Sequence, residues 1–309
     1  MEGQRTCYPP LRRVLVSGGT HGNELGGVYV VRHGAPCLSV SSVCVQTVVT
    51  EPVLSGQSGL SVSSVCVQTV VTEPVLSGQS ADSPYEVRRA LELNQIFGPK
   101  GSDQAVDFIC DLHNTTANTQ ACLICDSQSD YLSLHAARYL QSLSKQPCRI
   151  LLMKRNTPSF SFMSIGKHNM TIEMGPQPPG VIRADVYSKT LRLLQCLLDW
   201  IELFNTGAVI PAGSVQCFEV DQKIDYPRDS DGQLTACIHP QLQDRDFEPL
   251  NPEDPIFQPF SGGDPLVFGG EETVYPVFVN ECAYYSKGIA FWTTKKITIS
   301  LPAITVTQK

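Results

Sequence analysis

Residues 11–32 have the sequence LRRVLVSGGTHGNELGGVYVVR, and they set the first strand and helix of the fold. Residues 11–17 are mostly apolar and β-branched, which predicts a buried strand that ends at Gly18 and Gly19. Residues 24–32 have a helical pattern, so the glycine-rich segment before them is a strand-to-helix turn. In open α/β sheets, ligands bind beyond the carboxyl ends of the strands, where such turns lie.

Strands and helices alternate along the next part of the chain. Periodicity predicts strands over residues 106–112, 121–125, 149–154 and 170–174, and helices over residues 84–97, 130–143 and 184–204. This alternation predicts an α/β fold. After residue 206 short β-like runs (residues 224–227, 255–257, 273–279 and 297–304) are separated by Pro, Gly and Asp. We therefore expect an α/β domain over residues 1–206 and a β-rich domain over residues 207–309.

An identical tandem repeat interrupts the first domain. Residues 38–58, LSVSSVCVQTVVTEPVLSGQS, recur as residues 60–80 with Gly59 between the copies. A solenoid needs three or more diverged units, so the repeat indicates a recent duplication or an error in assembly of the gene sequence. Each copy could form one strand, around residues 43–49 in the first.

Composition excludes several classes of protein. Hydrophobic residues make up 42% of the 309 residues and charged residues 17%, which is enough for a packed core. The net charge is −7 without a cluster of basic residues, so we expect no nucleic-acid partner. The apolar stretches are too short or interrupted to span a bilayer, and the N-terminus lacks the apolar core of a signal peptide. We expect a cytoplasmic protein.

The twelve cysteines do not predict a disulfide framework, because a cytoplasmic protein keeps its thiols reduced. Cys122 and Cys125 have the spacing of a zinc or redox pair. Two strand residues three apart point to opposite faces, and the chain has no second pair at a matching distance. We interpret both as structural residues.

Two segments predict a metal site. His21 and Glu24 form a His-x-x-Glu pair on the turn after the first strand, and they can converge on one zinc ion. His113 lies at the end of another strand, and Asp111, on the same face, can orient an imidazole. Two His and one Glu are the usual ligands of a catalytic zinc, with water in the fourth position. The alternative is that both histidines are ordinary loop residues.

Glu173 is an acidic residue in an otherwise apolar strand that ends in a turn. An unpaired carboxylate in a protein core costs several kcal/mol, so its presence predicts a role. A general base for a metal-activated water is one such role. A structural, partly buried carboxylate is the alternative.

The chain resembles the aspartoacylase family, which is related to the zinc carboxypeptidases. The matching segments are residues 18–24, 84–100 (PYEVRRALELNQIFGPK), 111–118 (DLHNTTAN), 173–180 (EMGPQPPG), 225–228 (DYPR), 239–247 (HPQLQDRDF) and 274–285 (VYPVFVNECAYY). Together they extend over nearly the whole chain except residues 34–80.

This resemblance implies the fold and the roles of single residues. The family fold is a carboxypeptidase-like mixed sheet flanked by helices, with a C-terminal β domain that narrows the entrance to the site. His21, Glu24 and His113 match the zinc ligands, which implies one zinc ion per chain. Glu173 matches the catalytic, substrate-binding glutamate, and Tyr284 matches a substrate-binding tyrosine. The family also implies a homo-oligomer, a dimer or tetramer, and allows peripheral association with the plasma membrane.

Two branches of the family act on different substrates. One hydrolyses N-acetyl-aspartate, and an arginine ten residues before its catalytic glutamate holds the side-chain carboxylate. Here that position is Met163, next to Phe160 and Phe162. Apolar side chains suit an aromatic substrate better. The resemblance therefore implies an amidohydrolase for N-acyl aromatic amino acids or mercapturates, and aspartoacylase activity is the alternative.

One family segment is missing. Relatives carry an Asn-Pro, a lone arginine and an Asp-Leu-Asn-Arg phrase before the helix at residue 84, and those arginines hold the substrate and polarise its carbonyl. The repeat takes that place here, and residues 33–87 contain no arginine. The resemblance thus leaves a second alternative, a zinc-binding relative with impaired catalysis.

Overall fold

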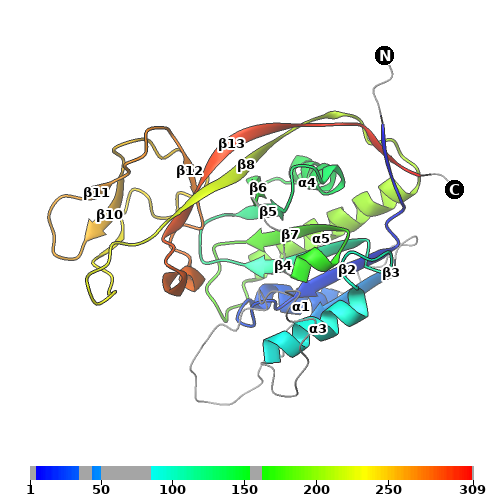
Figure 1. Cartoon of the computed structure of the whole chain (residues 1–309), viewed down its shortest axis with the longest axis horizontal. Helices are drawn as coiled ribbons and strands as arrows, with labels where there is room; N and C mark the ends of the chain where they lie inside the picture. The colour runs from blue at the N-terminus through cyan, green and yellow to red at the C-terminus, as the bar shows by residue number, and fades with distance from the viewer. Residues whose placement is uncertain (1–4, 35–43, 50–84, 154–161, 308–309) are drawn as a thin grey trace.

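The centre of the protein is a nine-stranded mixed β-sheet, seen in a computed structural model that describes residues 5–34, 44–49, 85–153 and 162–307 (Figure 1). Its strands, in chain order, are β2 (Arg13–Gly18), β3 (Cys44–Val49), β4 (Phe108–Asn114), β5 (Ala121–Cys125), β6 (Cys148–Leu152), β7 (His168–Met174), β8 (Gly213–Ile224), β12 (Tyr275–Val277) and β13 (Phe291–Leu301). Their order across the sheet is β12-β13-β8-β6-β5-β7-β4-β2-β3.

Strand direction explains where a site can form in this sheet. β3, β2, β4 and β7 are parallel neighbours, whereas β5 is antiparallel to β7. β6 and β8 continue in the direction of β5, and β13 and β12 alternate at the far edge. The carboxyl ends of β2, β4 and β7 therefore meet at one edge, where polar side chains from the following turns come together.

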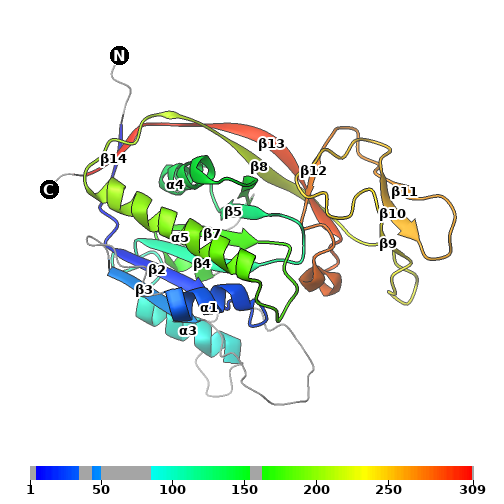
Figure 2. The same ribbon diagram turned by 180° about the vertical axis from the view of Figure 1, so that it is seen from behind.

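Helices cover both faces of the α/β part of the sheet. One face is covered by α1 (Leu25–Gly34), α4 (Tyr131–Leu143) and α5 (Ala184–Asn205). Figure 2 shows α1 and α5 side by side on this face. Phe108, Cys110 and Leu112 of β4 point into its core. The alternate residue Ile109 packs on the opposite face, against α3 (Tyr85–Phe97) and the 3-10 helix η2 (Phe162–Ile165).

Two glycines allow α1 to lie close to the sheet. A Cβ atom on Gly27 would lie 2.5 Å from the carbonyl oxygen of Leu112, and one on Gly18 would lie 2.4 Å from the carbonyl carbon of Gly27. Any larger residue at either position would push the helix away. Gly18 and Gly27 are thus required by close packing, which fixes the start of α1 against β2 and β4.

The C-terminal part is β-rich, as expected, but it does not form a sheet of its own throughout. β8 pairs with β6, and β13 then pairs with β8 from Phe291 opposite Ile224 to Leu301 opposite Gly213. β9 (Ala236–Ile238), β10 (Pro255–Pro259) and β11 (Leu266–Val267) form a separate three-stranded sheet, at the end far from both termini (Figure 1). Since the main sheet continues past residue 206, the domain division there stays a prediction.

The remaining elements are two short strands near the ends of the chain and a 3-10 helix. β1 (Thr6–Tyr8) pairs with β14 (Ile304–Val306), which brings the two ends of the described chain together. η3 (Cys282–Lys287) is a short 3-10 helix between β12 and β13. β3 belongs to the first copy of the repeat, and the second copy lies outside the described residues. In the described part of the chain, none of the helices has the length and apolar character that crossing a membrane requires.

Candidate metal centre

Three side chains converge where the predicted zinc ligands lie. His21 is in the turn after β2, Glu24 immediately precedes α1, and His113 is near the end of β4. The backbone N–H of Glu24 donates to the carbonyl oxygen of His21 at 3.0 Å, which closes a tight turn. One ligand atom from each of the three residues lies within 4.8 Å of the other two.

The Glu24 carboxylate lies between the two imidazoles. Its Oε1 contacts Nδ1 of His21, and its Oε2 is 3.0 Å from Nδ1 of His113. The N–H of Asn114 also donates to Oε2, at 2.9 Å. Burial alone would raise the pKa of the Glu24 carboxyl, but His113 and His21 lower it to about 2. Glu24 is therefore ionised, as a carboxyl group that binds a metal must be.

Asp111 fixes the orientation of the His113 ring. Nε2 of His113 is 2.8 Å from Oδ2 of Asp111, which leaves Nδ1 to face Glu24 and His21. Ser17 donates to Asp111 at 2.7 Å and Thr20 donates at 2.9 Å, so the buried carboxylate is fully engaged. A ligand histidine whose second nitrogen donates to a carboxylate is a common feature of zinc sites.

This donor set fits zinc. Two imidazole nitrogens and one carboxylate are a usual catalytic ligand set, so His21, Glu24 and His113 would hold a zinc ion here. Cys122 and Cys125 are free thiols of β5 that belong to two different core clusters, which agrees with the opposite faces that the strand spacing predicts.

Glu173 lies beside His113 because of the sheet register. β4 and β7 pair in parallel with His113 opposite Glu173, so both side chains emerge on the same face. Oε1 of Glu173 is buried and has no hydrogen-bond partner among the described residues. Burial raises the pKa of the Glu173 carboxyl to about 8, and the nearby Glu24 carboxylate contributes. A carboxyl group in such surroundings can exchange a proton near neutral pH.

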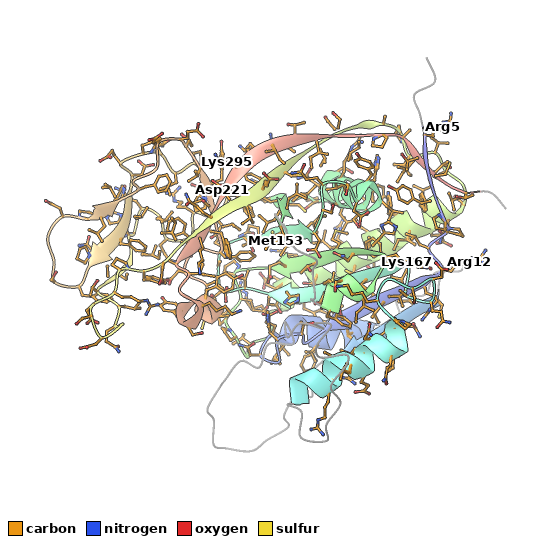
Figure 3. The ribbon with its side chains drawn as sticks, viewed as in Figure 1. Arg5, Arg12, Met153, Lys167, Asp221 and Lys295 are labelled. Atoms are coloured by element: carbon orange, nitrogen blue, oxygen red, sulfur yellow. The ribbon has the colours of Figure 1, made fainter. Side chains whose placement is uncertain are left out.

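A cavity of about 270 Å³ opens above these residues. Its polar floor contains His21, His113 and Glu173. Its walls are apolar and come from several elements, with side chains of Ile124, Met153, Phe162, Met163, Val220, Phe278, Ile289 and Trp292. Figure 3 labels Met153, which follows β6. The cavity therefore combines a chemically active floor with walls suited to an apolar group.

The short helix η3 supplies the cover of the cavity. Tyr284 and Lys287 both line it. Glu281, which caps η3 through the N–H of Ala283 at 3.1 Å, also accepts hydrogen bonds from Thr115 and from the N–H of Thr116, the latter at 2.7 Å. The loop that follows His113 is thus tied to the C-terminal part of the chain.

Comparisons with known proteins agree with this geometry. Residues 73–201 match the succinylglutamate desuccinylase/aspartoacylase catalytic domain, and residues 213–296 match the AstE/AspA barrel-sandwich hybrid domain. The human N-acyl-aromatic-L-amino acid amidohydrolase (carboxylate-forming) is 46% identical over 96% of this chain and 94% of its own length. The chain belongs to the succinylglutamate desuccinylase/aspartoacylase family.

Two other members of the succinylglutamate desuccinylase/aspartoacylase family are also similar to this chain. Mouse aspartoacylase is 40% identical over 96% of both chains. The crystal structure of murine aminoacylase 3 is 44% identical over 96% of this chain and 99% of that chain, with a TM-score of 0.88. The latter similarity confirms the predicted mixed sheet with flanking helices and a β-rich C-terminal part.

The site residues predicted from the sequence lie together in the structure. His21, Glu24, His113, Glu173 and Tyr284 all belong to the cavity or to the cluster at its floor. Three residues of the site were not predicted from the sequence: Asp126 and Lys287, which line the cavity, and Glu281, which anchors η3. One signal was available for Lys287: it follows Tyr284 by three residues, which is one turn of a 3-10 helix.

Proposed function

We propose that this family member hydrolyses the amide bond of N-acyl, chiefly N-acetyl, aromatic amino acids and releases a carboxylate and a free amino acid. The observation that carries the proposal is the buried Glu173 carboxyl opposite His113, at the floor of an apolar cavity. Relatives from human and mouse, whose names specify N-acyl-aromatic-L-amino acids, support the substrate class.

His21, Glu24 and His113 would hold one zinc ion per chain. Bound zinc supplies Lewis acidity, which polarises the scissile carbonyl and lowers the pKa of the attacking water. Glu173 accepts a proton from that water as its oxygen bonds to the acyl carbon. Glu173 then delivers the proton to the amide nitrogen as the C–N bond breaks, so the amine leaves in neutral form.

The cavity walls support an aromatic substrate. Phe162 and Met163 are buried and line the cavity on one side, where an aromatic ring would pack. Tyr284 lines the same cavity, and its hydroxyl would bind the polar part of the substrate. The side-chain carboxylate of N-acetyl-aspartate would be buried without a partner against the apolar wall, at a cost of several kcal/mol. Mercapturates, which are N-acetylated cysteine thioethers, have an apolar group at the favoured position.

One observation supports a second candidate, a zinc-binding relative with impaired catalysis. Residues 33–87 contain no arginine, although the family resemblance predicts substrate-binding arginines there. Loss of one electrostatic stabiliser of the transition state typically lowers the rate by about 10²- to 10³-fold. The second candidate therefore predicts zinc binding with little turnover.

Turnover of two substrates separates these possibilities. The zinc-loaded chain is incubated with N-acetyl-L-tyrosine or with N-acetyl-L-aspartate, and free amino acid and acetate are quantified. We expect tyrosine and acetate in equal amounts, formed faster than the products of the aspartate compound. Faster release of aspartate would favour the aspartoacylase alternative, and the absence of both products would favour the impaired relative. A cytoplasmic location and a homo-oligomeric state stay predictions.

A further inference from the structure

Apart from the metal-site histidines His21 and His113, Lys287 is the one basic side chain among the described residues that line the cavity. Three acidic residues, Asp111, Asp126 and Glu173, line the same cavity. An N-acyl amino acid carries a carboxylate, which a cation at the cavity would attract. Away from the metal cluster, Lys287 is therefore the cationic partner that the described cavity lining offers the substrate carboxylate.

The geometry of η3 directs Lys287 into the cavity. A 3-10 helix has three residues per turn, so Tyr284 and Lys287 lie on the same side of η3. Nζ of Lys287 is 5.4 Å from the centroid of the Tyr284 ring, within the range of a cation–π contact. The ammonium group thus lies beside the tyrosine that lines the cavity, and its exposure places it at the opening.

Both ends of η3 are anchored, which gives Lys287 a defined position. At the start, Glu281 joins η3 to Thr116 of the loop after His113. At the end, Gly288 adopts a left-handed conformation with a φ of 65°, and a Cβ atom there would lie 2.9 Å from Oδ2 of Asp225. Glycine is required at that position, so the backbone that carries Lys287 is held between two fixed contacts.

We propose that Lys287 binds the α-carboxylate of the substrate and thereby selects N-acyl amino acids over N-acyl amines. The proposal rests on the function proposed above and names the residue that recognises the acid group of that substrate. A lysine ammonium acts as a point charge on a flexible stem, which suits a single carboxylate at the opening of the cavity. The apolar walls then receive the side chain of the amino acid.

A pair of probes that differ only in the carboxylate tests this assignment. N-acetyl-L-tyrosine carries the α-carboxylate, and N-acetyltyramine is the same molecule without it. In the zinc-loaded full chain, Lys287→Met should raise KM for N-acetyl-L-tyrosine by about 10- to 100-fold, the usual value of a charged hydrogen bond. It should leave kcat within a few-fold, and it should change KM for N-acetyltyramine much less than KM for N-acetyl-L-tyrosine. Lys287→Arg, which keeps the charge, should restore part of the affinity.

Lys295→Met is the matched control for loss of one positive charge. Lys295 lies on β13 near Asp221 and Glu272, at 3.9 and 3.5 Å, and does not line the cavity (Figure 3). We expect its KM values to equal those of the unmodified chain. Equal increases of KM in Lys287→Met and Lys295→Met would overturn the proposal, because they would indicate long-range attraction alone. An equal increase of KM for both probes in Lys287→Met would also overturn the proposal.

Calorimetric binding keeps this test independent of turnover. The unmodified chain should bind N-acetyl-L-tyrosine more tightly than N-acetyltyramine, and Lys287→Met should remove that preference even if neither compound is hydrolysed. Preference for the anion without hydrolysis would refute the proposed function and retain the role of Lys287. Hydrolysis of N-acetyl-L-tyrosine with an unchanged preference in Lys287→Met would retain the function and refute the role of Lys287. Melting temperatures of all variants exclude a folding defect.

Discussion

The floor and the cover of the cavity are built in different ways. The floor consists of His21, Glu24, His113 and Glu173, at the ends of three adjacent parallel strands. The cover consists of η3 and its anchor Glu281, which come from the C-terminal part of the chain and reach the floor through side-chain hydrogen bonds. Sheet register places the residues of the floor, whereas a few long-range contacts place those of the cover.

Because the floor and the cover are built differently, we expect substitutions in the floor and in the cover to have different effects. Changes in the floor should remove the metal or the proton transfer and leave most of the fold intact, because the sheet is formed by backbone pairing. Changes in the cover should alter substrate binding and stability, and the metal should stay bound. The predictions below test this separation, beginning with the largest effect.

Removal of two ligands from the floor should abolish metal binding. In the His21→Ala, His113→Ala double variant, Glu24 alone would remain of the three ligands. Elemental analysis should find about one zinc per chain in the unmodified protein and almost none in the variant. His239→Ala, outside the cluster, is the control and should keep its zinc. Full zinc content in the double variant would mean that the metal binds elsewhere.

Glu173→Gln should separate metal binding from proton transfer. Glutamine keeps the shape of the side chain but cannot accept the proton, so kcat should fall by at least ~10²-fold. Zinc content should not change, since Glu173 is not part of the ligand cluster. If the kcat of the unmodified chain is measurable and the variant retains it, Glu173 is a structural carboxylate.

The floor could be predicted from the sequence because its signals are local. Gly18 and Gly19 end a strand, His21 and Glu24 are three residues apart, and His113 ends a second strand. The cover could not be predicted in the same way. Contacts such as Glu281 with Thr115 join residues that are 166 positions apart, and no periodic pattern records them.

The C-terminal strands show the same limit of sequence reasoning. The expected run at residues 224–227 captures only the end of β8, which starts at Gly213 and continues the main sheet. Polar residues alternate through much of this strand, so its apolar signal is weak. Its pairing with β6 and β13 provides the stabilisation that local propensity does not.

Glu281→Ala should weaken the cover and leave the metal in place. The carboxylate accepts hydrogen bonds from the N–H of Thr116 at 2.7 Å and from its hydroxyl at 3.1 Å, and these donors would lose their partner. Loss of charged hydrogen bonds of this kind should lower the free energy of unfolding by about 2–3 kcal/mol. Urea unfolding measures it, and zinc content is determined in parallel. Unchanged stability would show that η3 is held by other contacts.

Asp246 should make the stability of the folded chain depend on pH. Burial raises the pKa of its carboxyl to about 7, although the N–H groups of Val279 and Asn118 donate to it at 3.2 and 3.1 Å. The folded chain therefore holds a proton that the unfolded chain, with an aspartate pKa of about 3.9, has already lost. The resulting stabilisation is complete below about pH 4 and is lost as the pH rises through about 7.

Asp246→Asn removes this titration. The melting temperature of the unmodified chain minus that of the variant should decrease between pH 5 and pH 8. A difference that stays constant over this range would mean that the backbone donors outweigh burial and that the carboxyl is ionised throughout.

Anomalous X-ray diffraction at the zinc edge tests the central claim most directly. Crystals of the zinc-loaded chain should give one strong peak per chain, about 2.0–2.2 Å from one atom each of His21, Glu24 and His113. That peak should lie at the floor of the cavity, next to the carboxyl of Glu173. A peak at other residues, or zinc-loaded crystals without a peak among these three side chains, would contradict the account.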